Sequence, residues 1–216
     1  MSFRLPLFPL ELVLLPGELV PLHIFEPRYR QLLRDCLAGE HRFGIVPEAV
    51  PETLGSVAGI RGTHLHPNGQ AHIVVQGERR FRVRALMPEP HPYPVAMVDE
   101  FEDLPTTAPE AAALTRLRGQ GEALRDSIGI LADRPGAVEA FVADAEGLSF
   151  QVAAMLDLDL KARSRLVAER STQARVELLL GLLPNAVLQT ASRAEVHLRA
   201  RSNGTGHQGS AITGPE

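Results

Sequence analysis

Apolar and polar residues follow different periods in the two halves of the chain. In residues 3–25, the apolar runs "FRLPLFPL" and "ELVLLPGELVPLHIF" are broken by proline and glycine, which predicts two extended segments near a sheet edge. Further strands are predicted at residues 42–50, 55–66, 70–86 and 95–104. From about residue 105, leucines recur at helical spacing instead. Runs of strands followed by runs of helices favour an α+β fold.

One helix interrupts the strands. After Pro27, the apolar residues fall at i, i+3, i+4, i+7 and i+8 on one helical face; they are Tyr29, Leu32, Leu33, Cys36 and Leu37. Proline suits the first helical position, Glu26 places negative charge at the positive end of the helix dipole, and Gly39 is a natural stop. The stretch "EPRY" is therefore interpreted as a joint between a strand and a helix, with Arg28 and Tyr29 structural.

A long hairpin is predicted around Asn68-Gly69, with a bulge at Gly77. In its second arm, Ile73, Val75, Phe81 and Val83 share one parity, while His72, Arg80, Arg82 and Arg84 share the other. A two-residue turn pairs His66 with Ala71. His72 then lies on the face away from His64 and His66, and the three histidines converge only if the register slips by one residue.

The second half of the chain predicts a helical bundle. Pro135 ends a first helix that begins after residue 105, and "LSFQVAAMLDL" is a second helical segment. Asp159 and Ser171 are predicted to cap the next two helices, and Pro184 to stop the last of these before a polar helix that continues to about Arg201. The predicted division is a β-rich subdomain at 1–104, a helical subdomain at 105–201 and a disordered tail at 202–216.

Composition narrows the classes of function. The net charge is −4 and aromatic residues make up 5% of the 216 residues, which does not favour nucleic acid as a partner. No stretch approaches the roughly 20 apolar residues that span a bilayer. Prolines break the apolar N-terminus, unlike a signal peptide, and Cys36 is the single cysteine. We therefore expect a cytoplasmic protein without a membrane partner.

Several ordered blocks resemble the N-terminal substrate-binding domain of Lon ATP-dependent proteases. They are "LPLFPLELVLLPGELVPLHIFEPRYRQLL", "GSVAGI", "GERRFRV" and the helical stretch "LSFQVAAMLDLDLKARSRLVAERSTQARVELLLGLL". The resemblance covers roughly residues 3–185. It implies a PUA-like β pseudo-barrel with one inserted helix, followed by a C-terminal helical bundle.

The motifs of a complete Lon protease are not in this sequence. An ATPase would need a glycine-rich phosphate loop ending in Gly-Lys, and no Gly-Lys pair occurs. A Ser-Lys peptidase would need a lysine of lowered pKa beside a serine, whereas Lys161, with Ser164 three residues on, lies in a helix predicted to be exposed. We expect a stand-alone binding domain that is not an enzyme and has no catalytic residue or cofactor.

The sequence favours three alternative functions less. A hydrolase lacks a nucleophile elbow, and Cys36 lies on an apolar helix face where a thiol is unreactive. A metal site is not expected, because His64, His66 and His72 diverge in the predicted register. An RNA- or nucleotide-binding PUA-like module would use Arg80, Arg82 and Arg84, but an arginine row on a solvated strand more often guards a sheet edge.

The preferred hypothesis is binding of unfolded or extended polypeptide. An incompletely closed, proline-broken sheet leaves a strand edge with which a polypeptide could pair through its backbone. The candidate contact residues are Pro9, Leu14, Leu15, Leu22, Phe25, Pro92 and Tyr93. The protein would serve protein quality control as an adaptor or regulator, with a separate ATP-dependent protease as a partner. Whether the helical half forms a homodimer is left open.

Overall fold

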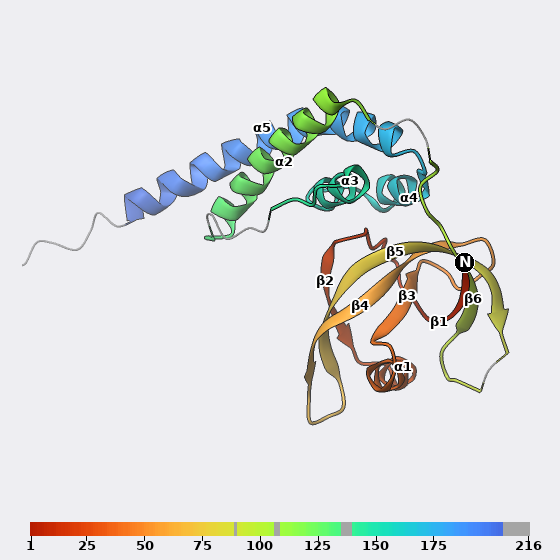
Figure 1. Cartoon of the computed structure of the whole chain (residues 1–216). Helices are drawn as coiled ribbons and strands as arrows, with labels where there is room; N and C mark the ends of the chain where they lie inside the picture. Colours follow the sequence, from red (N-terminus) through yellow and green to blue (C-terminus); the bar gives the residue numbers. More distant parts are fainter. Residues whose placement is uncertain (89, 106–108, 135–139, 205–216) are drawn as a thin grey trace, which may run out of the picture.

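The computed structural model describes residues 1–88, 90–105, 109–134 and 140–204. A small β-barrel with one helix lies on one side, and four further helices lie together on the other (Figure 1). The predicted α+β class, with one helix inserted among the strands and a helical bundle after them, is confirmed. None of the helices in the described ranges is both long and apolar enough to cross a membrane.

Of the six strands in the described residues, five close the barrel. The strands are β1 (Ser2–Pro9), β2 (Leu19–Ile24), β3 (Arg42–Val46), β4 (Leu54–Leu65), β5 (Ala71–Met87) and β6 (Val95–Glu100). Their order is β2-β5-β4-β3-β1-β6, and an additional β5–β6 pairing closes the ring. The β1–β3 pair is parallel and the other pairs are antiparallel. Strand β5 is long enough to pair with β2 through its first half and with β6 through its second.

Helix α1 (Pro27–Ala38) is the predicted joint after β2. It begins with proline in its first turn and ends at Gly39. Its buried face carries Tyr29, Leu32, Leu33 and Cys36, which join the core formed with Phe8, Phe43 and Ile73. The ring centroids of Phe8 and Tyr29 lie 4.2 Å apart. The apolar period therefore identified both the helix and the face that packs on the barrel.

The extended segment predicted for residues 11–25 is a strand only from Leu19 onward. Before it, residues 13–15 run between the barrel and the helices. Leu14 belongs to the barrel core, whereas Val13 and Leu15 belong to the core of the helices. Gly77 permits this close approach, because a Cβ atom there would lie 2.1 Å from the Leu15 carbonyl oxygen. The bulge predicted at Gly77 is present, as a register irregularity where β4 faces Gly77 to Arg80.

The helical unit consists of α2 (Ala111–Leu131), α3 (Ala145–Ala154), α4 (Leu160–Ala168) and α5 (Thr172–Gly204). The predicted caps are confirmed: Asp159 accepts a hydrogen bond from the Ala162 N–H, and Ser171 accepts one from the Ala174 N–H. Asp144 caps α3 in the same way, which the sequence reading missed.

The predicted stop at Pro184 is wrong, because Pro184 lies inside α5 and the helix continues to Gly204. A proline removes one backbone hydrogen bond but need not end a helix that is held by packing. Here Leu183 and Ala194, on either side of Pro184, are both buried, and α5 runs beside α2 for much of its length (Figure 1). The tail predicted from residue 202 lies largely outside the described residues.

Candidate functional site

Strand β2 has one open edge. It pairs with β5 on one side, and within the described residues it stands at the end of the strand order. Pro21 lies in the middle of β2, and a proline nitrogen cannot donate to a ladder, so we expect it to face away from β5. Leu19 and His23 share its parity, and successive residues of a strand turn their backbone groups to opposite edges. Their N–H and C=O groups are then expected to face outward.

The solvent face beside this edge is partly apolar. Leu19 is 60% exposed, Phe25 55% and Val74 39%. Pro21 pairs with Val74 in the register of β2 and β5, so the apolar positions lie next to one another across the strands. We call the outer edge of β2, with Leu19, Phe25 and Val74, the β2 surface. It combines backbone groups with apolar side chains in one place.

Four histidines gather at one end of the β2 surface. His72 pairs with His23 of β2 on one side and with His64 of β4 on the other. The His23 and His72 rings are stacked with centroids 4.6 Å apart, and His66 Nε2 lies 2.7 Å from His72 Nδ1.

The predicted separation of His72 from His64 and His66 is therefore wrong. The His66 N–H donates to the Gln70 carbonyl, so the connection has three residues, 67–69, instead of two. Gly69 adopts φ +79°, which such a three-residue connection requires. This slip of one residue brings the three histidines to one face. His23 was not predicted to belong to this group. The signal for it was the period of two along β2, which places His23 on the same strand face as Leu19 and Pro21.

The structure separates the predicted contact residues into two groups. Phe25 and Pro92 are exposed, and Pro9 and Leu22 are partly buried. Leu14, Leu15 and Tyr93 are buried at 1%, 0% and 5% exposure, so a polypeptide on the surface does not reach them. Leu14 and Leu15 fill the two cores, and the Tyr93 hydroxyl donates a 2.6 Å hydrogen bond to Asp35. Apolar character alone did not distinguish core residues from contact residues.

Arg80 does not belong to a solvated arginine row. Its side chain is 1% exposed, because the helical unit covers this part of β5. It donates to the Val167 and Glu169 carbonyls at 2.9 and 2.8 Å and pairs with Asp103 and Glu146. Arg82 and Arg84 remain partly or fully exposed. The RNA-binding alternative therefore loses one of its three arginines.

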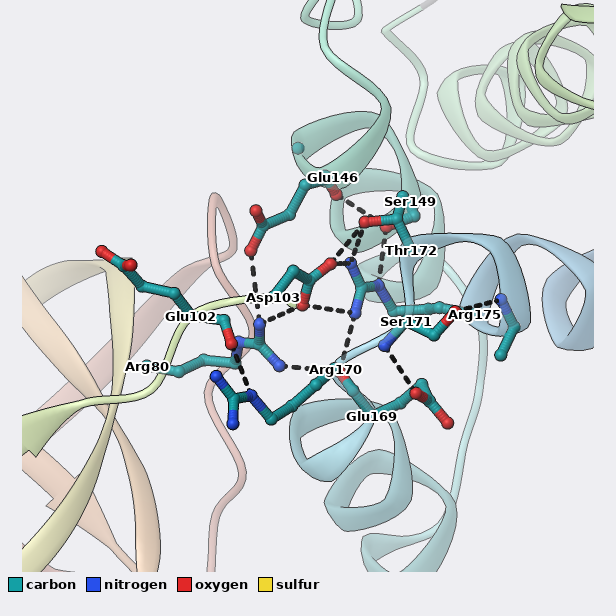
Figure 2. A network of polar contacts seen from close by, with 12 residues as sticks. Arg80, Glu102, Asp103, Glu146, Ser149, Glu169, Arg170, Ser171, Thr172 and Arg175 are labelled. Atoms are coloured by element: carbon teal, nitrogen blue, oxygen red, sulfur yellow. Dashed lines mark hydrogen bonds and ion pairs between the residues drawn. The ribbon is translucent and has the colours of Figure 1, made fainter. Parts of the chain in front are cut away.

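Asp103 lies at the centre of a network that joins the barrel to the helices (Figure 2). It follows β6 and accepts hydrogen bonds from Arg80 of β5 and from Thr172 and Arg175 of α5. Arg175 is fully buried and also donates to Ser149 of α3 at 2.8 Å. Side chains of β5 and α5 thus meet at the Asp103 carboxylate, and Ser149 joins α3 to the network through Arg175.

The charges of the network are balanced by these contacts. Burial raises the pKa of Asp103, but the hydrogen bonds from Arg175 and Thr172 and the charges of Arg175 and Arg80 outweigh it and hold that pKa below its usual value. The pKa of Glu146 is raised by burial and by the charge of Asp103. Every buried charge has a partner, which indicates a structural joint between the two units.

The side chains considered for catalysis are Cys36, Ser164 and Lys161. Burial and the charge of Asp35 raise the pKa of the Cys36 thiol to about 12, and its Sγ donates to the Arg42 carbonyl. The thiol is therefore protonated at neutral pH and is a poor nucleophile. Ser164 donates to the Leu160 carbonyl, and Lys161 is exposed. Within the described ranges, no three or more His, Cys, Asp or Glu side chains are arranged to hold a metal ion.

Comparison with solved structures identifies close relatives of this fold. The crystal structure of a Lon N-terminal domain protein from Xanthomonas campestris matches with a TM-score of 0.62 and 28% identity, over 84% of this chain and 99% of that one. The N-terminal domain of a Mycobacterium avium complex Lon protease matches with a TM-score of 0.59 over 83% of this chain and 97% of that one. At 19% identity, the second match supports the fold alone.

Sequence comparison agrees. The chain is 20% identical to the Lon protease of Cytophaga hutchinsonii over 92% of its length, and 28% identical to Lon protease 2 of Myxococcus xanthus over 83%. It spans about a quarter of those relatives, 26% and 23% respectively. The family model of the ATP-dependent protease La (LON) substrate-binding domain matches residues 4–185. On this match and the shared fold, the chain belongs to the Lon substrate-binding domain family.

Proposed function

We propose that the protein binds unfolded or extended polypeptide by adding it as a strand to the outer edge of β2. The observation that carries this proposal is the open edge itself, which is flanked by exposed Leu19, Phe25 and Val74. Backbone hydrogen bonds would hold the polypeptide without regard to its sequence, and the apolar side chains would add contact area. Family membership supports a substrate-binding role of this kind.

The bound polypeptide would be held and not cleaved. The thiol of Cys36 is protonated and buried, and the side chains of Lys161 and Ser164 do not form a nucleophile and base pair. We therefore propose a role in protein quality control, as an adaptor or regulator that holds a client for an ATP-dependent protease. The relatives named as Lon proteases are about four times as long as this chain, so their proteolytic activity does not transfer with the match.

Binding is tested with a dye-labelled extended peptide and fluorescence anisotropy. A second peptide of the same sequence carries N-methyl groups on successive residues, so that neither of its edges can donate hydrogen bonds to β2. We expect binding of the first peptide and loss of binding of the second. The amides of Leu19 and His23 should shift in the ¹H–¹⁵N spectrum on binding. Equal affinity for both peptides would contradict strand addition.

A pair of variants tests the apolar part of the surface. Phe25→Ser should weaken binding about tenfold, which corresponds to ~1.4 kcal/mol. Leu188→Ser is the matched control, because Leu188 is 68% exposed on α5, in the helical unit. If Leu188→Ser weakened binding and Phe25→Ser did not, the binding surface would lie on the helical unit.

A further inference from the structure

The four histidines form a row that ends at the open edge. His64, His72 and His23 are direct neighbours across β4, β5 and β2. A strand added outside β2 would extend this row by one position, with a client side chain opposite His23. Side chains directly opposite in neighbouring strands lie close enough to interact. The client side chain would therefore meet an imidazole that already contacts a second one.

His66 completes the group above the row. Its ring lies at 4.8 Å from the ring of His64 and at 4.8 Å from that of His72, in edge-to-face contacts. His23 also contacts the exposed ring of Phe25, at 5.6 Å between centroids. The histidines are thus part of the β2 surface, and we call them the histidine cluster.

The two carboxylates that flank the cluster along the chain are paired with arginines, and Arg30 is a further cation near the hairpin turn. Glu26, on the joint after β2, pairs with Arg28. Glu78, further along β5, pairs with Arg42 and Arg61. Arg30 of α1 lies against Gly69 in the hairpin turn, and His23 contacts the amide of Gln70. Among the contacts found within the described part of the chain, no carboxylate touches the cluster.

The cluster therefore lacks the anion that its protonated form would need. Desolvation and the charges of His64, His72 and His23 lower the pKa of His66. Each proton on the cluster opposes the next, because like charges at short distance raise the free energy of the doubly charged form. A carboxylate placed beside the row would reverse this effect.

We propose that the histidine cluster selects extended polypeptides that carry a carboxylate side chain opposite His23, and that their binding is coupled to uptake of a proton by the cluster. This inference rests on the proposed strand addition at β2. The carboxylate stabilises the protonated imidazole, and by linkage the protonated cluster binds the carboxylate more tightly. Acidic clients would then bind more tightly as the pH falls from 8 to 6, while neutral clients would not.

The test uses two peptides that differ at one position, glutamate against glutamine. Calorimetry at pH 6.5 in two buffers of different ionisation enthalpy measures the protons taken up on binding. We expect uptake of a fraction of a proton, up to about one, with the glutamate peptide and none with the glutamine peptide. Affinity for the glutamate peptide should rise about tenfold between pH 8 and pH 6. The measurements are made with a chelator and repeated without it.

Variants assign the proton to the cluster. His23→Gln removes the imidazole that a client carboxylate would face and should abolish the difference between the two peptides. His41→Asn is the control, because it removes a histidine outside the cluster and asparagine tolerates the left-handed φ of 58° at that position. Equal pH dependence in the wild type and His23→Gln would overturn the assignment.

The remaining outcomes separate the two proposals. If both peptides bind at the β2 edge with equal affinity and no proton uptake, the inference is wrong and strand addition stands. If neither peptide binds between pH 6 and pH 8, both proposals fall. If selectivity for glutamate disappears with chelator and returns with Zn²⁺, the cluster acts as a metal ligand and proton coupling is wrong.

Discussion

The two ends of strand β5 carry clusters of basic side chains in opposite settings. Near the hairpin, His72 lies in a solvent-facing group of imidazoles without a carboxylate in contact. Beyond Gly77, Arg80 lies beneath the helical unit and meets Asp103, Glu146 and two carbonyl groups. The difference arises because the helical unit packs over Arg80 and does not pack over His72. A buried charge needs partners from its own chain, whereas an exposed group can pair with a bound molecule instead. The covered cluster therefore stabilises the fold, and binding is the role proposed for the open one.

The largest effect is expected at the covered cluster. Arg175→Met leaves Asp103 buried with one cation fewer and should lower the free energy of unfolding by about 3–5 kcal/mol. Urea unfolding followed by circular dichroism measures the loss. Arg199→Met is the control: it removes an exposed pair with Glu195, 3.7 Å apart, and should cost less than about 1 kcal/mol. Equal losses in the two variants would contradict the structural role of the network.

Gly77 lies between the two ends of β5, and a substitution there tests how tightly segment 13–15 packs on the strand. Gly77→Ala places a Cβ atom 2.1 Å from the Leu15 carbonyl oxygen, and backbone must move to relieve the clash. We expect a loss of about 1–3 kcal/mol in the same unfolding assay. Gly62→Ala, on the neighbouring strand β4, has no atom within 4 Å of the new Cβ and should be nearly neutral. A neutral Gly77→Ala would mean that segment 13–15 does not pack tightly on β5.

The smallest expected effects are changes in the free energy of unfolding with pH, which occur in different pH ranges for the two clusters. The folded pKa of Asp103 lies below its unfolded value near 3.8, so its stabilisation is present above that pH and is lost as the pH falls through the folded value. The folded pKa of His66 lies below 6.5, so stability is higher above pH 6.5 and decreases as the pH falls through the folded value. Unfolding experiments between pH 8 and pH 2.5 should show both losses.

Two variants assign these losses. His66→Gln should remove only the loss just below pH 6.5, and Asp103→Asn should remove only the loss below pH 3.8, although it lowers stability at every higher pH. If His66→Gln left the upper loss unchanged, the imidazoles would not be coupled as their contacts indicate.

The sequence predicted those features that depend on local periodicity. Tyr29, Leu32, Leu33 and Cys36 marked the buried face of α1, and Asp159 and Ser171 marked two helix starts, because spacing and capping act within one element. The helix stop at Pro184 was wrong because packing along α2 outweighed the local preference of proline.

The features of the candidate site depend on strand register and on which surfaces the helical unit packs over. No short segment of sequence specifies either of these. A three-residue connection in place of a two-residue one decided whether His72 joined His64 and His66. Arg80 has the same sequence pattern as Arg82, and only the helical unit packed over it makes it buried. Likewise, the sequence pattern of Leu14 and Leu15 does not distinguish them from exposed apolar residues. In the structure, Leu14 lies in the barrel core and Leu15 in the core of the helices.

Segment 13–18 has a mechanical consequence if a polypeptide adds to β2 as proposed. It leads directly into β2, and it is fixed in both units: Ser56 Oγ donates to the Leu14 carbonyl, Arg163 Nε donates to the Val13 carbonyl, and Arg163 pairs with Glu18. Tension applied to a strand beside β2 would load these attachments in shear, distributed over barrel and helices together.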